Sequence, residues 1–217
     1  MRLVFEQIRT GGDRNFAYLF GDRVRKEAAI IDPSYDPAKV VGRAQAQGLT
    51  VRYIICTHSH PDHTNGNEEA QSLCAAPIAA FRSSPIRPQL ALEDDQLLPI
   101  GDFSLRVLHT PGHCDDHIVL YNAEHQLVIT GDLIFVGKVG GTQTAAQTRT
   151  EFESIQRVLQ EVPAPTTLWP GHDYGCRPSS TIALEKAVNP FVMAANLEEF
   201  ETVKATWPQF KQSLGLF

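Results

Sequence analysis

The chain has 217 residues, of which 42% are hydrophobic and 20% charged, a balance typical of a globular protein with a sizeable buried core. Its net charge of -6 argues against a nucleic-acid partner, because phosphate binding requires a basic surface. No apolar run approaches the roughly 18 residues that cross a bilayer, so no membrane association is expected. The N-terminal residues lack the apolar core of a secretory signal, which favours a cytoplasmic location.

The first half of the chain alternates strand-like and helical patterns. Four short apolar runs predict strands, at residues 3–8, 16–20, 28–31 and 51–56. Helices are expected over 37–47, which is followed by Gly48, and over 68–75. A short apolar piece spans 77–81, and the segment 83–99, rich in proline and acidic residues, is predicted to be a loop.

The second half contains a second block of strands. Three of them are predicted, at residues 103–108, 118–121 and 127–129, and a fourth at 166–169. The Gly- and Thr-rich segment 137–148 is expected to be a gap before a helix over 150–161, started by Thr150 with Glu153 in capping-box spacing. Because the two blocks lack a strict β-α-β alternation, they predict two mixed sheets face to face with helices outside.

Residues 176–217 are predicted to form a short helical extension of a single domain that spans 1–217. Helices are expected near 181–188 and 197–206. The apolar side chains of this tail are expected to cover the core, or alternatively to form a contact between two copies, so the chain is a monomer or a homodimer. These side chains are Phe191, Phe200, Trp207, Phe210, Leu214, Leu216 and Phe217.

Side chains that can bind a metal ion occur in four short segments, each of which follows an apolar run. The densest segment, residues 57–63, has the sequence Thr-His-Ser-His-Pro-Asp-His. The other three present His113, Asp132 and His172, each directly after a glycine. Imidazole and carboxylate groups are ligands of zinc, iron and manganese, and loops at strand ends can direct them to one point.

The spacing within these segments predicts two neighbouring metal ions. His58 and His60 are two residues apart, so an extended backbone points both the same way. Pro61 forces a turn that can direct the following side chains toward a second ion. The carboxylate of Asp132 can bridge two ions, which stand roughly 3.5–4 Å apart in two-metal hydrolytic sites. The predicted ligands are His58, His60 and His113 for one ion, Asp62, His63 and His172 for the other, and Asp132 for both.

Residues 58–63 match the signature His-x-His-x-Asp-His, and the chain is identified as a member of the metallo-β-lactamase-fold superfamily. The further ligands of that family fall on His113, Asp132 and His172, and the resemblance covers about residues 1–175. It implies an α+β fold, a four-layer αββα sandwich, with a dinuclear centre at one edge. Zinc is the first choice for the two divalent ions, and iron and manganese are the alternatives.

Within the superfamily the chain is similar to the glyoxalase II group, through Thr-Gly-Asp-Leu-Ile-Phe at 130–135 and Pro-Gly-His-Asp-Tyr at 170–174. This implies hydrolysis of a small-molecule thioester, with glutathione as one candidate carrier, by a hydroxide that bridges two metal ions. Asp62 and Asp132 are then the catalytic carboxylates. Lys138 and Tyr174 are candidate substrate contacts, since Gly141 and Gln143 stand where that group carries its basic and aromatic glutathione contacts.

Persulfide dioxygenases also resemble this chain and give the alternative function. They use a single non-haem iron, which would be held here by His58, His113 and Asp132, with open positions for oxygen. Gly141 departs from the basic glutathione contact of that group as well. A metal-binding module without catalysis is a third interpretation.

A few nearby residues have two possible roles. Asp32 and His117 either stabilise local backbone or support a metal ligand. Cys114 directly follows His113, but neighbouring side chains usually point apart, so the predicted ligands do not include it.

Overall fold

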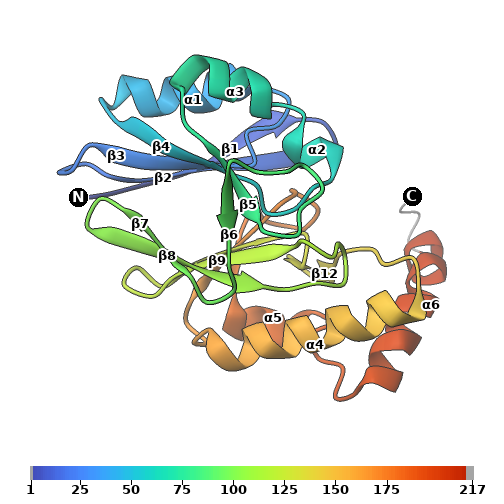
Figure 1. Ribbon diagram of the computed structural model, residues 1–217. Coiled ribbons are helices and arrows are strands. Elements are labelled where there is room, and N and C mark those ends of the chain that lie inside the picture. The colour runs from blue at the N-terminus through green and yellow to red at the C-terminus, as the bar shows by residue number, and fades with distance from the viewer. Residues whose placement is uncertain (1, 214–217) are drawn as a thin grey trace.

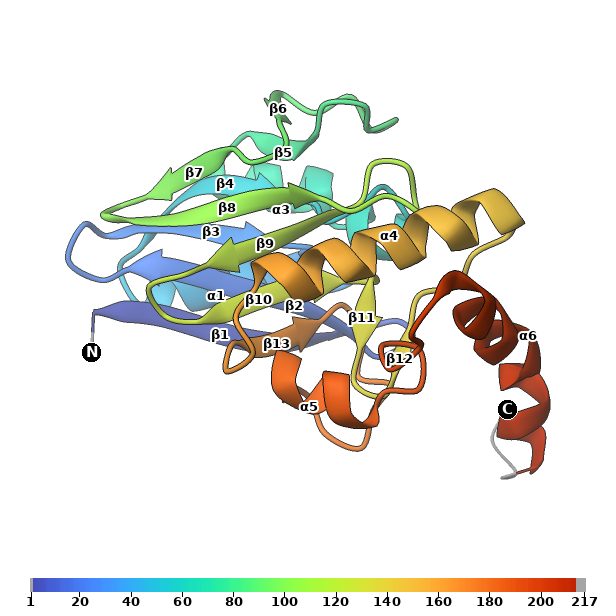
Figure 2. The same ribbon diagram turned by 90° about the horizontal axis from the view of Figure 1, so that it is seen from below.

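Two six-stranded sheets pack face to face in the computed structural model, which describes residues 2–213 (Figures 1 and 2). The helices are α1 (Pro37–Ala46), α2 (Pro61–Thr64), α3 (Asn67–Cys74), α4 (Ala145–Glu161), α5 (Ile182–Val188) and α6 (Leu197–Ser213). Helices α1 and α3 lie outside the first sheet, and α4 and α5 lie outside the second. This is the predicted α+β fold, a four-layer αββα sandwich.

The first sheet is built from the N-terminal strands in chain order. These are β1 (Leu3–Gly11), β2 (Asn15–Asp22), β3 (Glu27–Ile31), β4 (Thr50–Ile55), β5 (Ile78–Phe81) and β6 (Leu90–Leu92). Strands β1 to β3 pair antiparallel through short turns, whereas β3, β4 and β5 run parallel because α1 and α3 provide the crossovers. Helix α1 begins where Asp36 accepts a hydrogen bond from Lys39 N, with Pro37 in its first turn.

The second sheet has the order β14-β13-β10-β9-β8-β7. Its strands are β7 (Leu97–Ile100), β8 (Phe103–His109), β9 (Ile118–Asn122), β10 (Leu127–Gly131), β13 (Thr167–Pro170) and β14 (Ser180–Thr181). Strands β10 and β13 pair parallel, because α4 connects them, and the other neighbours pair antiparallel. A separate two-stranded ribbon, β11 (Ile134–Phe135) with β12 (Lys138–Val139), follows β10.

The core consists of three apolar layers. The central layer lies between the sheets and includes Phe20, Leu105 and Leu120, all fully buried. One outer layer lies between the first sheet and α1 and α3, and the other between the second sheet and α4 to α6. Burial of apolar surface on both faces of each sheet is the main force that holds the four layers together.

The segment 83–99, which the sequence predicts as a loop, contains two strands instead. Strand β6 adds to the edge of the first sheet beside β5, and β7 forms an edge of the second beside β8. Pro99 lies within β7, where an edge strand tolerates a residue that lacks an N–H donor. The proline and acidic content that indicated a loop is therefore compatible with two short edge strands.

Helix α4 begins five residues earlier than the sequence predicts. Thr144 is its N-cap, and Thr144 and Gln147 form the capping box, whereas Thr150 lies inside the helix. Thr144 with Gln147 and Thr150 with Glu153 have the same spacing, so spacing alone could not distinguish them. The Gly- and Thr-rich gap accordingly ends at residue 144.

The C-terminal tail has the two predicted helices, and α6 continues to Ser213 rather than ending at 206. Phe191 and Phe200 are buried in the outer layer, as expected of a segment that covers the core, whereas Phe210 is 51% exposed. The predicted apolar contacts of Leu214, Leu216 and Phe217 lie outside the described residues. No helix among residues 2–213 is both long and apolar enough to cross a bilayer.

The fold brings four loops to one edge of the sandwich. Strands β8, β10 and β13 run in the same direction, so their carboxyl ends lie at the same edge of the second sheet. Strand β4 of the first sheet ends opposite them. A hydrogen bond across the sandwich, from Ile118 N to Thr57 O at 2.8 Å, joins the two edges at this point. The four loops that carry the predicted ligands follow these strands.

Candidate metal centre

The loop after β4 is held by Asp32, which is 2% exposed and follows β3. Its carboxylate accepts hydrogen bonds from Thr57 N at 2.8 Å, from the Thr57 hydroxyl at 2.6 Å and from His63 Nδ1 at 3.0 Å. Asp32 therefore has both of the roles that the sequence left open, since it stabilises the backbone turn and orients His63.

The turn that follows His60 is the short helix α2, with Pro61 in its first position. The Nδ2 group of Asn15, at the start of β2, donates to the backbone oxygen of Asp62 at 3.0 Å and to its Oδ2 at 3.1 Å. After this turn Asp62 and His63 lie beside His172, as Pro61 predicts, while the His63 ring also stays next to His58, at 4.1 Å between ring centres. Asn15 has no sequence pattern that could have indicated this role.

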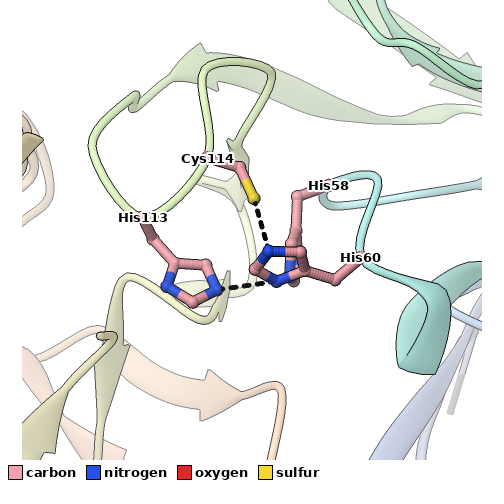
Figure 3. Close-up of side chains that lie close together, drawn as sticks. All are labelled: His58, His60, His113 and Cys114. Atoms are coloured by element: carbon pink, nitrogen blue, oxygen red, sulfur yellow. Dashed lines mark hydrogen bonds between the residues drawn. The ribbon is translucent and has the colours of Figure 1, made fainter. Parts of the chain in front are cut away.

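One group of donors combines the loops after β4 and β8 (Figure 3). The Nδ1 atom of His60 lies 3.1 Å from His58 Nε2 and 3.0 Å from His113 Nε2. Cys114 Sγ lies 3.2 Å from the other nitrogen of His60. Cys114, which the sequence analysis left out of the predicted ligands, lies beside this group, against the nitrogen of His60 that does not face His58 and His113.

A second group of donors lies beside the first. His63 Nε2 is 3.1 Å from His172 Nε2, and Asp62 Oδ2 lies 3.5 Å and 3.4 Å from these two nitrogens, respectively. Asp132 lies between the two groups, with Oδ2 3.3 Å from His172 Nε2 and 3.6 Å from His113 Nε2. The structure thus brings all seven side chains that the sequence predicts as ligands to one place.

When these imidazoles are neutral, as metal ligands must be, their hydrogen bonds place the single proton on Nδ1 and leave the inward-facing nitrogen without one. Nδ1 donates to Asp32 in His63, to the Gly141 backbone oxygen at 2.7 Å in His113, and to the Asp13 backbone oxygen at 2.8 Å in His172. Their Nε2 atoms therefore face one another as lone pairs, which cannot hydrogen-bond to each other. Asp132 Oδ1 is buried and has no hydrogen-bond partner among residues 2–213.

These distances fit bound metal ions. Ligands of one tetrahedral ion at about 2.1 Å from it are roughly 3.4 Å apart, close to the spacing found in both groups. A cation at each position would satisfy the converging lone pairs and the buried carboxylate oxygen. The donor set is therefore suited to divalent metal ions.

Burial affects the protonation of the first group. Burial, and then the proximity of His63, lower the pKa of His58 well below its ordinary value. Burial likewise lowers the pKa of His113. Both imidazoles are consequently neutral at physiological pH, which is the form that binds a metal ion.

The second group is dominated by carboxylates. Burial lowers the pKa of His63, but Asp132 and Asp32 outweigh it and raise that pKa well above its usual value. The pKa of His172 rises to about 9, because Asp132 and Asp62 outweigh the effect of burial. Burial raises the pKa of Asp132, yet His63 and His172 hold it well below the ordinary range. In the absence of a cation, these carboxylates thus draw protons onto the neighbouring imidazoles.

His117 supports the loop that carries Asp132. Its Nε2 accepts a hydrogen bond from Asp132 N at 3.1 Å, and its Nδ1 lies 2.8 Å from the Thr110 hydroxyl. Burial lowers the pKa of His117 to about 3, which keeps the ring neutral and able to accept this bond. His117 therefore contacts the backbone of a predicted ligand rather than its side chain.

The two predicted substrate contacts lie next to each other. Lys138 Nζ is 3.9 Å from the centre of the Tyr174 ring, a cation–π distance. The Tyr174 ring stacks on His172 at 4.6 Å, and its hydroxyl donates to Asp13 Oδ2 at 2.5 Å. Lys138 also lines a cleft of about 600 Å³ between β12, α4 and α6, together with Trp207 and Lys211.

The comparisons with known proteins agree with this geometry. The sequence model of the metallo-beta-lactamase superfamily matches residues 10–83 and 75–172. This chain belongs to the metallo-beta-lactamase superfamily. The superfamily's enzymes use metal ions, and this member presents the corresponding histidine and aspartate groups.

Relatives of this superfamily member include both classes of enzyme that the sequence indicates. A probable polyketide biosynthesis zinc-dependent hydrolase, BaeB of Bacillus velezensis, is 31% identical over 94% of this chain and 91% of its own. The mitochondrial persulfide dioxygenase ETHE1 of Homo sapiens is 29% identical over 92% of this chain and 78% of its own. The hydroxyacylglutathione hydrolase of Rhodospirillum rubrum is 31% identical over 88% of this chain and 74% of its own.

Among solved structures, ETHE1 from Myxococcus xanthus superposes with a TM-score of 0.85, at 28% identity over 94% of this chain and 91% of that one. This likeness supports the metallo-beta-lactamase fold over nearly the whole chain. Because relatives at similar identity include both hydrolases and a dioxygenase, similarity alone does not separate the two reactions.

Proposed function

We propose that this superfamily member is a thioester hydrolase that uses two divalent metal ions, with zinc as the first choice. The observation that carries the proposal is the intact second group of donors. Asp62, His63 and His172 have ligand atoms that lie 3.1–3.5 Å apart, and Asp132 connects them to the first group. A single-iron reaction through His58, His113 and Asp132 does not require this second group.

Two bound ions would supply an activated water near neutral pH and polarise the thioester carbonyl. His58, His60 and His113 would hold one ion, Asp62, His63 and His172 the other, and Asp132 both. Asp132 is buried, so its carboxylate is shielded from bulk water, whereas the Asp62 side chain is 33% exposed. Asp62 is therefore the proposed catalytic carboxylate with access to solvent, whereas the hydrogen bond from His172 holds its pKa well below the ordinary range.

The cleft beside the centre supports a small-molecule substrate with an anionic carrier. Lys138 and Lys211 line it, and burial, followed by the proximity of Lys211, lowers the pKa of Lys138. Neither lysine takes part in an ion pair within the described residues, so both can bind an anionic group. We propose Lys138 as the carrier contact, with Tyr174 behind it, since the ammonium group lies over the Tyr174 ring.

A persulfide dioxygenase is the second candidate, because ETHE1 proteins are similar to this chain in sequence and fold. In that case one iron would be bound by His58, His113 and Asp132, and Asp62, His63 and His172 would only support it.

The first experiment is elemental analysis of protein purified without added metal, combined with assays of thioester hydrolysis and of oxygen uptake with glutathione persulfide. Close to two ions per chain with hydrolysis would support the proposal. One iron per chain with oxygen uptake would reject it in favour of the dioxygenase.

Substitution of His172 tests the same choice in a single protein. His172→Ala should lower metal content by about one ion and reduce hydrolysis at least about 100-fold, because a ligand of the second ion is lost. His125→Ala, in a turn where the ring contacts Asn122, is the control and should leave both unchanged. Hydrolysis at the wild-type rate by the His172→Ala protein would contradict the two-metal proposal.

A further inference from the structure

Lys204 on α6 contacts the loop between β12 and α4. Its ammonium group donates to the Gly140 carbonyl oxygen at 3.0 Å and to the Thr142 hydroxyl at 3.0 Å, and it forms an ion pair with Glu151 of α4. An ammonium group has three N–H donors, so these three acceptors use all of them. Lys204 thereby connects α6, α4 and the loop at one point.

The loop that Lys204 holds is also the loop that orients His113. The Nδ1–H group of His113 donates to the Gly141 carbonyl oxygen at 2.7 Å. Gly140 packs so closely that a Cβ atom there would lie 2.9 Å from His113 Nδ1 and 2.2 Å from the backbone oxygen of Asp132. The position of residues 140–142 therefore sets the direction of the His113 ring.

Helix α4 contacts the His113 loop from the other side. A Cβ atom at Gly112 would lie 2.5 Å from Glu151 Cα, and the Ser154 hydroxyl donates to the Pro111 carbonyl oxygen at 2.7 Å. Glu151 is fully buried, and among the described residues the Lys204 ammonium group is the charged partner of its carboxylate. Lys204 and Glu151 thus hold each other in place next to the loop that carries His113.

We infer that Lys204, held by Glu151, is a positioning residue for His113 as a metal ligand. The inference rests on the proposed function in that it takes His113 as a ligand of the first ion. A metal-bound imidazole keeps its tautomer and direction when its other N–H group has a fixed acceptor. Lys204 fixes that acceptor by holding the Gly140 carbonyl oxygen and the Thr142 hydroxyl on either side of it, so the C-terminal helix contributes to the metal centre.

The test is zinc affinity, measured by competition with a chromophoric chelator at pH 8. Lys204→Met removes the ammonium group but keeps most of the apolar stem, and we expect it to weaken binding of the first ion about 10–100-fold. His113→Ala provides the reference for loss of that ion. The visible absorption of the cobalt-substituted protein should shift, because it reports the ligand geometry.

Lys186→Met is the matched control. Lys186 is on α5, and its ammonium group donates to the Leu159 carbonyl oxygen at 3.0 Å, so it also joins a helix to a neighbouring backbone. Among residues 2–213, its ammonium group has no hydrogen bond or ion pair with a proposed ligand or with residues 140–142. We expect the zinc affinity and the cobalt spectrum of this variant to match the wild type.

A double variant separates positioning from stability. Lys204→Met alone leaves the Glu151 carboxylate buried without its partner, which destabilises the fold. Glu151→Gln/Lys204→Met removes this charge, and we expect it to recover much of the melting temperature of the metal-free protein but not the zinc affinity. Recovery of both would show that the pair is only structural and would overturn the inference.

Thr142→Val is the milder probe if Lys204→Met does not fold, because it removes one of the loop acceptors of Lys204. It should also weaken binding of the first zinc ion, and an unchanged zinc affinity would overturn the inference.

The measurement of zinc affinity does not depend on the reaction that the protein catalyses. If Lys204→Met loses one ion while the wild type hydrolyses no thioester, the inference stands and the proposed function fails. If the wild type hydrolyses a thioester but Lys204→Met binds zinc normally, the proposed function stands and the inference fails.

Discussion

At the scale of single residues, the buried carboxylate of Asp32 links two of the proposed metal ligands. It accepts hydrogen bonds from the backbone and hydroxyl of Thr57 and from His63. The Thr57 hydroxyl lies 3.1 Å from His58 Nδ1, so Asp32 contacts one proposed ligand directly and another through Thr57. One carboxylate therefore orients residues of both donor groups.

Asp32→Asn should weaken binding of the second metal ion about 10–100-fold. Oδ1 of Asp32 accepts from Thr57 N, and Oδ2 accepts from the Thr57 hydroxyl and from His63. The amide has an acceptor oxygen at only one of these two positions, so it cannot keep all three hydrogen bonds. Competition titration with a chelator measures the effect. Asp36→Asn, which keeps an N-cap side chain on α1, is the matched control. Equal zinc affinity in Asp32→Asn and the wild type would rule out this role.

At the scale of elements, α4 lies between β10 and β13 in the chain and contacts the loop of His113 through Glu151 and Ser154. The residue at which this helix begins is set by its N-cap. Thr144 accepts a hydrogen bond from Gln147 N at 3.1 Å, and the Gln147 side chain accepts one from Thr144 N at 3.1 Å. Thr150 instead donates from its hydroxyl to the Ala146 carbonyl oxygen, inside the helix.

Thr144→Ala should lower the free energy of unfolding by about 1 kcal/mol, the usual cost of losing an N-cap. Thr150→Ala should have little effect or slightly stabilise the protein, because alanine favours helix interiors and no cap is lost. Urea unfolding of the two variants makes the comparison. A larger loss for Thr150→Ala would mean that the helix begins where the sequence alone predicted.

At the scale of the whole molecule, a buried carboxylate joins the two sheets at the end far from the metal-binding loops. Asp22, at the end of β2, accepts hydrogen bonds from Arg2 at 3.0 Å and 2.8 Å and from Asp102 N, in the β7–β8 turn, at 3.0 Å. The hydrogen bond from the Arg2 guanidinium, and then those from backbone N–H groups, hold the pKa of Asp22 well below its ordinary range.

A lowered pKa means that ionised Asp22 stabilises the fold at pH values above the pKa of an unfolded aspartate, about 4. This contribution is lost as the pH falls below 4 toward the folded-state pKa. The difference in the free energy of unfolding between the wild type and Asp22→Asn should therefore be largest near pH 7 and shrink below pH 4. Urea unfolding of the metal-free proteins measures it, with Glu124→Gln as an exposed control. A difference that does not vary with pH would contradict the assignment.

Much of the fold was predictable because its strands have strong apolar patterns. The β4 region, for example, has a buried apolar run that leads directly into the His-rich segment. Edge strands such as β6 were not predictable, because three residues beside prolines and acids carry too weak a pattern. The start of α4 was ambiguous because two threonines have equivalent capping partners.

The sequence by itself was enough to predict the superfamily and the αββα fold. The metal-ligand signature of residues 58–63 and the three later ligands each follow an apolar run, and both features can be recognised from local sequence alone. The tertiary structure decided which groups hold those side chains in place. Asn15, Asp32 and Lys204 contact residues 25 to 64 positions away, and Cys114 faces His60 from a different loop. Contacts of this kind depend on how distant segments pack together, and no local pattern in the chain encodes them.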